Sequence, residues 1–85
     1  MNNMIGKFLN FRKESSMTVG MIYKITKTRI YCVDCCQCDR YITIEDFNTR
    51  TDSNNNKWFW IDNEPTDKFW YDTNKINTLK KLKNI

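Results

Sequence analysis

The chain of 85 residues contains no histidine, no alanine, one proline and two glycines. Without histidine it lacks the side chain that most often moves protons near neutral pH. It also has only three serines and no glycine-rich loop of the kind that cradles phosphate groups. We therefore expect a protein that is not an enzyme and acts by binding.

Long apolar runs are absent as well. No stretch is long enough to cross a bilayer, and the opening MNNMIGKFLNF lacks the continuous apolar core and cleavage site of a secretory signal. We therefore expect a cytoplasmic protein without a membrane partner, whose cysteines stay reduced. Abundant asparagine, lysine, isoleucine and threonine indicate an AT-rich genome, such as that of a phage or another mobile element.

The four cysteines lie within seven residues: Cys32, Cys35, Cys36 and Cys38. Thiolates are good zinc ligands, and the C-x2-C spacing occurs twice in this cluster. A zinc ribbon needs a second ligand pair farther along the chain, which this sequence lacks. An ion would therefore be held by this one loop alone, shared between two chains, or completed by an acid such as Asp34 or Asp39. Three interpretations stay open: a zinc site at these four residues, reduced structural cysteines in a tight turn, or redox or iron-sulfur chemistry.

The densest aromatic segment is 57–73, KWFWIDNEPTDKFWYDT, which holds six of the twelve aromatic residues. Its two aromatic runs flank Pro65 and predict a β-hairpin. In the register centred on Pro65, Trp60 faces Trp70. Both faces of this hairpin are then apolar, although an ordinary one-sided sheet needs one. We expect the C-terminal helix or a partner to cover the second face.

The remaining periodicity predicts the fold class. Residues 18–26 alternate as a half-buried strand does, and the strand either continues past residue 29 or ends at a turn there. Residues 40–47 predict another strand, and 48–56 a polar loop. Apolar residues at every third position of 72–85 predict an amphipathic helix. We therefore expect a small α+β domain, in which an antiparallel sheet of about four strands, or a small open barrel, packs against this helix.

The first 16 residues have two interpretations. Met17 can be an alternative start, because the codons before it can encode a bacterial ribosome-binding sequence. Alternatively, residues 1–16 form a flexible or helical extension, with apolar side chains such as Phe8 and Leu9 on one side. In both interpretations residues 18–85 form a single domain.

Charge is segregated along the chain. Residues 1–30 hold six basic and one acidic side chain, residues 31–74 hold four basic and nine acidic, and residues 75–85 hold four basic. Simple nucleic-acid binders usually carry one basic stripe, whereas this chain has an acidic centre between basic ends. The acids of the aromatic segment disfavour phosphate and favour a partner with a basic surface.

Tryptophan dominates protein-binding hot spots, so we expect a small protein-binding module, such as a phage inhibitor of a host protein. That partner can be a protein with a basic, nucleic-acid-binding surface. A homodimer that pairs two hairpin faces or two cysteine loops is compatible with the same pattern. The expected partner-binding residues are Trp58, Trp60, Trp70, Asp62, Glu64 and Asp67. The alternative is a nucleic-acid binder with a cysteine-only zinc site, in which the tryptophans stack on bases. Its basic residues would be Lys57, Lys68, Arg40 and Arg50.

Overall fold

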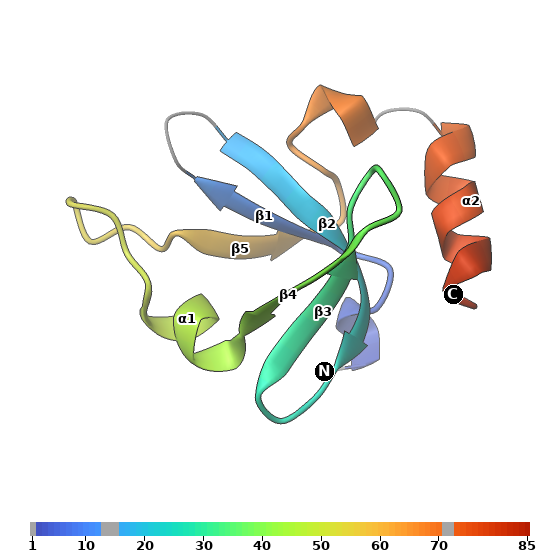
Figure 1. Ribbon diagram of the computed structural model, residues 1–85. Helices are drawn as coiled ribbons and strands as arrows, with labels where there is room; N and C mark the ends of the chain where they lie inside the picture. Colours follow the sequence, from blue (N-terminus) through green and yellow to red (C-terminus); the bar gives the residue numbers. More distant parts are fainter. Residues whose placement is uncertain (1, 13–15, 71–72) are drawn as a thin grey trace.

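The computed structural model describes residues 2–12, 16–70 and 73–85, which form a five-stranded antiparallel sheet and a C-terminal helix (Figure 1). The strands are β1 (Phe8–Arg12), β2 (Ser16–Ile25), β3 (Arg29–Val33), β4 (Asp39–Thr43) and β5 (Phe59–Asp62). The α-helices are α1 (Ile44–Thr49) and α2 (Thr73–Leu82), and the short 3-10 helices are η1 (Asn2–Met4) and η2 (Lys68–Trp70). This confirms the expected α+β class.

The strand order is β4-β3-β2-β1-β5, so the first four strands form a meander and β5 returns to pair with β1. The edges of the sheet are therefore β4 and β5. A turn at Thr26, whose N–H donates to the carbonyl of Arg29 at 2.9 Å, separates β2 from β3. Close strand packing requires glycine at Gly20, because a Cβ there would lie 2.6 Å from the Val33 carbonyl oxygen.

The expectation of a flexible or helical segment over residues 1–16 is wrong for residues 8–12. These residues form β1, which lies between β2 and β5. Phe8, Leu9 and Asn10 are consecutive and all buried, because the two faces of this strand contact two different cores. Such a strand shows no alternation of apolar and polar residues. Whether Met17 also serves as a start stays a prediction.

The predicted aromatic hairpin is also wrong. Residues 59–62 form β5, but β5 pairs with β1, and Trp60 lies opposite Asn10 instead of Trp70. Residues 68–70 form η2. Tyr71 and Asp72, the end of the predicted second strand, lie outside the described residues.

A buried polar network explains this difference. The Thr18 hydroxyl donates to Asn10 Oδ1 at 2.8 Å and accepts the backbone N–H groups of Thr66 and Asp67 at 2.9 and 3.2 Å. The Asn10 amide donates to the carbonyl of Glu64 at 3.3 Å. Since buried polar groups need partners, these bonds hold the segment after β5 across the sheet and keep it from folding back onto β5.

The sheet has a buried core on each face. On one face, which we call the helix-covered face, α2 and η2 cover a cluster made of Phe8, Met21, Val33, Trp70 and Leu79. On the other, which we call the cavity face, the buried residues are Leu9, Ile22, Ile30, Cys32 and Phe59.

The helix predicted at the C-terminus is confirmed as α2, with Leu79 buried. None of the helices in the described ranges combines the length and apolar character that a bilayer crossing needs.

The strand predicted over 40–47 ends at Thr43, and α1 begins at Ile44. The Thr43 hydroxyl accepts the N–H of Asp46 at 3.0 Å, which caps the new helix. This local bond ends the strand earlier than apolar alternation predicts. The helix then leads to the polar loop, in which Asp52 Oδ1 accepts the N–H groups of Asn54 and Asn56.

Candidate nucleic-acid interface

Three tyrosines lie side by side on the three strands of the β4 end of the sheet. Tyr31 on β3 and Tyr41 on β4 are direct register partners, with ring centroids 5.8 Å apart. Tyr23 on β2 lies at a register irregularity between Ile22 and Lys24, and its ring centroid is 6.4 Å from that of Tyr31. Tyr41 is 52% exposed and the other two are half-buried. We call these three residues the tyrosine row.

A cation lies over each ring of the tyrosine row. Lys83 Nζ is 4.1 Å from the Tyr23 centroid, and Lys24 Nζ is 5.3 Å from the Tyr31 centroid. The Arg29 guanidinium carbon is 4.4 Å from the Tyr41 centroid. Arg29 also donates to the Tyr31 hydroxyl at 3.3 Å. The row therefore joins three aromatic rings and three positive charges on one face of the sheet.

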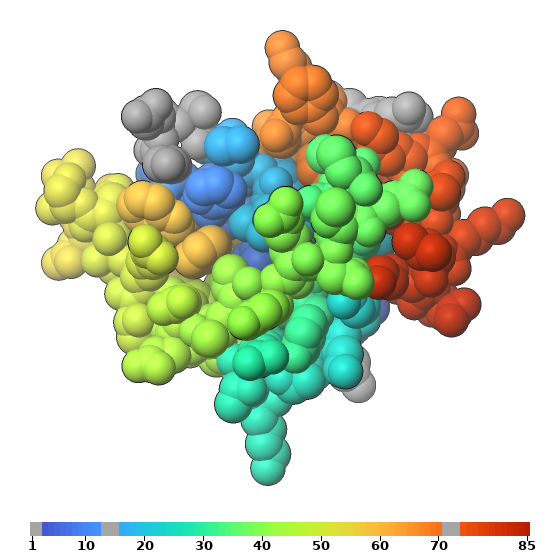
Figure 2. Space-filling view, viewed as in Figure 1, coloured from blue at the N-terminus to red at the C-terminus, as the bar shows by residue number. Residues whose placement is uncertain are grey.

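Among the described residues, one of the three cations of this row is paired with an acid. Lys83 forms an ion pair with Asp39 at 2.7 Å, and Figure 2 shows α2 in red against the β3–β4 hairpin in green. This hydrogen bond raises the pKa of Lys83. In the described part of the chain, neither Lys24 nor Arg29 has a carboxylate within ion-pair distance. The row therefore has positive charge to offer to an anionic ligand.

The structure separates the residues predicted to bind a partner. Trp70 is 1% exposed and packs edge-on against Phe8, with ring centroids 5.4 Å apart. Trp60 is half-buried beside Arg12, and Trp58 is half-buried in the other core cluster. The predicted acids are Asp62 and Glu64, which are exposed, and Asp67, which is half-buried and accepts the N–H of Phe69.

Trp58 instead lines an open groove of about 410 Å³ on the cavity face. The groove is formed by Phe11, Val19, Arg50, Trp58 and Phe59. The Arg50 guanidinium carbon lies 5.4 Å from the centroid of the Trp58 ring, and the backbone N–H of Trp58 donates to the Arg50 carbonyl at 3.0 Å. These contacts fix the tryptophan at the groove wall.

The cysteines also separate. Cys32 is buried on the cavity face, and burial raises the pKa of its thiol to about 12. Cys35 packs against the helix-covered core, while Cys36 and Cys38 are exposed. Among the described residues, no three cysteine or carboxylate side chains converge in the way a metal ion requires. Zinc binding at the four cysteines stays a prediction.

A single carboxylate organises the cysteine loop. Asp34 Oδ1 accepts hydrogen bonds from the backbone N–H groups of Cys36 and Cys38, both at 2.9 Å. Its Oδ2 accepts a hydrogen bond from Arg40 Nε at 3.0 Å. Partial burial alone would raise the pKa of Asp34, but these hydrogen bonds outweigh it and lower the pKa. Gln37 completes the turn with a φ of 67°. The loop therefore has the geometry of a tight turn around Asp34.

The tyrosine row was missed because its members come from three separate strands. The strand register is needed to see that Tyr31 lies opposite Tyr41, and the irregularity at Tyr23 shifts that residue out of simple alternation.

Comparison with protein-family models, with characterised proteins and with solved structures finds no match for this chain.

Proposed function

We propose that this protein binds single-stranded nucleic acid through the tyrosine row. The observation that carries the proposal is the pairing of three neighbouring rings with Lys24, Arg29 and Lys83. Proteins that bind single strands combine aromatic faces, on which bases stack, with cations that contact the backbone phosphates. Lys24 and Arg29 form no ion pair with a carboxylate of the described residues, so both can move from the rings to phosphates.

The ring spacing favours an unstacked strand over a duplex. The centroids lie 5.8 and 6.4 Å apart, nearly twice the rise of about 3.4 Å between bases of one strand in B-form DNA. Bases that stack on one another therefore cannot also stack on successive tyrosines. A splayed single strand can place one base on Tyr31 and one on Tyr41 when Lys24 and Arg29 move aside, while Lys83 stays over Tyr23 and contacts the backbone.

The test is anisotropy of a fluorescent 20-nucleotide single strand and of the matching duplex, measured over a salt series. We expect preference for the single strand, and Tyr41→Ala should weaken binding about 5- to 100-fold, the usual contribution of one stacked base. Phe69→Ala is the matched control, because Phe69 is an aromatic residue 66% exposed on η2, away from the row. Arg29→Gln should reduce the slope of log K against log salt by about 0.7. Equal effects of the Tyr41 and Phe69 variants would contradict the proposal.

A protein partner is the second proposal, and the groove beside Trp58 supports it. Trp58 and Arg50 are residue types enriched in binding hot spots. The exposed acids nearby in sequence are Asp62, the last residue of β5, and Glu64, which follows the strand. A host protein with a basic surface fits this combination. Affinity purification from the native host, with and without nuclease, separates the two proposals. A stoichiometric protein that survives nuclease and is lost with Trp58→Ala supports the second one.

Both proposals concern a binding protein and require no catalysis. We also propose a cytoplasmic location, because the four cysteines are free thiols and a reducing compartment keeps them so.

A further inference from the structure

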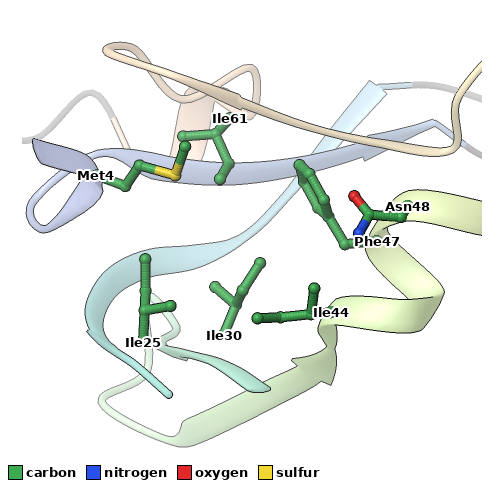
Figure 3. Close-up of a pocket in the computed structure, with 7 residues that line it drawn as sticks. All are labelled: Met4, Ile25, Ile30, Ile44, Phe47, Asn48 and Ile61. Atoms are coloured by element: carbon green, nitrogen blue, oxygen red, sulfur yellow. The ribbon is translucent and has the colours of Figure 1, made fainter. Parts of the chain in front are cut away.

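The cavity face contains a second hollow, of about 240 Å³, beneath α1 (Figure 3). Five separate elements contribute to its wall: η1, β2, β3, α1 and β5. Its lining residues are Met4, Ile25, Ile30, Ile44, Phe47, Asn48 and Ile61. In Figure 3 the isoleucines of β2 and β3 point toward the same space as Ile61 from the opposite side.

The length of α1 explains why this space is left. Ile44, Phe47 and Asn48 lie at positions i, i+3 and i+4 and so share one side of the helix. The helix has six residues, and no residue of it is buried. It therefore reaches from β4 toward β5 without filling the hollow of the curved sheet.

The chemistry of the lining selects the occupant. Among the described residues, no charged side chain lines the cavity, so a charged ligand would lose its hydration without gaining a partner. The Asn48 amide is the one polar side chain that the described part of the chain contributes, whereas a bound water needs two to four polar partners. An apolar cavity of about 150 Å³ is large enough for benzene. This one therefore has room for a ring with a short substituent.

A small molecule fits this site better than a protein surface does. Protein interfaces place an apolar core within a larger contact area. The large apolar side chains exposed in the described residues are Met17, Tyr41, Phe69, Leu82 and Ile85. None of these lines the cavity, so its apolar surface is recessed.

We propose that this cavity binds a small, uncharged, predominantly apolar molecule about the size of a substituted aromatic ring. The Asn48 amide receives the one polar group of the ligand. Met4 extends toward Ile61 in Figure 3 and, as a flexible side chain, adapts to the ligand. This site is independent of the nucleic-acid proposal, because Ile30 lies on the opposite face of β3 from Tyr31.

The test uses the full chain with ¹³C-labelled isoleucine methyl groups and three probes: toluene, benzyl alcohol and benzoate. Toluene and benzyl alcohol should shift the methyl signals of Ile25, Ile30, Ile44 and Ile61 in a saturable way. The methyl signals of Ile76 and Ile85, which do not line the cavity, should stay in place. Benzoate should bind at least tenfold more weakly, because its charge has no partner.

Two variants sharpen the result. Ile25→Phe fills part of the space and should weaken toluene binding at least fivefold. Asn48→Leu, at an exposed residue that folding tolerates, should weaken benzyl alcohol about 2- to 10-fold and leave toluene unchanged, the effect expected for one neutral hydrogen bond. Absence of saturable shifts, equal shifts at Ile76 and Ile85, or benzoate binding as tight as toluene would overturn the proposal.

Discussion

The two faces of the sheet are closed in different ways. On the helix-covered face a long chain crossing brings Trp70 onto Phe8 and Met21, and the Asn10–Thr18 network fixes that crossing. On the cavity face a six-residue helix spans the gap and leaves a hollow of about 240 Å³. The same five strands therefore support one close-packed face and one with room for a ligand. The difference comes from the length and anchoring of the covering segment.

Removing β1 should have the largest effect, because this strand belongs to both faces. A chain that begins at Met17 lacks Phe8, which packs on the helix-covered face, and Leu9, which packs on the cavity face. It also leaves β2 and β5 without their shared neighbour. We expect loss of cooperative unfolding and of methyl signal dispersion. A truncated chain that still unfolds cooperatively would show that β1 is dispensable.

A matched pair of tryptophan variants tests the helix-covered face directly. Trp70→Ala should lower the free energy of unfolding by about 3–5 kcal/mol, since it empties a fully buried site. Trp60→Ala should cost less than about 1 kcal/mol, because Trp60 is half-buried and its cation contact with Arg12 lies near the surface. Urea denaturation measures both. Equal costs would mean that the two tryptophans are equally buried.

Substituting a larger side chain on each face of the sheet shows which of the two faces is packed more tightly. Met21→Phe should destabilise the protein by about 1–3 kcal/mol, because Met21 is fully buried in the close-packed core. Ile25→Phe should be nearly neutral or slightly stabilising, since the added atoms enter the cavity. Thermal and urea unfolding of both variants check this. If Ile25→Phe is the more harmful of the two, the cavity face is the more tightly packed.

The pH dependence of stability that comes from the Cys32 thiol shows whether the core of the cavity face excludes water. Its pKa is raised by burial to about 12 from an ordinary 9.0. Between these two values the unfolded state binds fewer protons than the folded state, so stability falls as pH rises. The slope is at most about 1.4 kcal/mol per pH unit.

Denaturation of the native chain and of Cys32→Ala between about pH 8 and about pH 10 isolates this contribution. We expect the pH slope to decrease in the variant. Cys36→Ser is the control for the loss of one thiol, because Cys36 is exposed. A native slope equal to that of Cys32→Ala would mean that water reaches the thiol.

Local periodicity was sufficient for the fold class, for β2 and for α2. It failed for β1, because Phe8, Leu9 and Asn10 are all buried and show no alternation. It also failed after Pro65, where aromatic residues favour a strand but the Thr18 hydroxyl holds the backbone of residues 66 and 67 on the sheet. In both places a contact between distant parts of the chain decided the local structure.

The candidate sites were harder to predict than the fold. We predicted the binding site at the tryptophans because they are close together in the sequence, yet Trp70 is a core residue. The tyrosine row and the cavity each combine residues from at least three elements, so neither forms a cluster in the sequence. The four cysteines are close in sequence, but they do not share one site. The side chain of Cys32 points into the core of the cavity face, whereas Cys35 packs against the core of the helix-covered face.

The pairing of β5 with β1 sets the order in which this protein can form during synthesis. The hairpins from β1 to β4 join neighbours in sequence, so they can form as the chain emerges. β1 stays an edge strand, open to pairing with other chains, until residue 62 is available. Sheets that depend on such distant pairing fold in milliseconds to seconds, slower than helical bundles of this size. We therefore expect the addition of β5, which also supplies Ile61 to the cavity wall, to be among the last steps of folding.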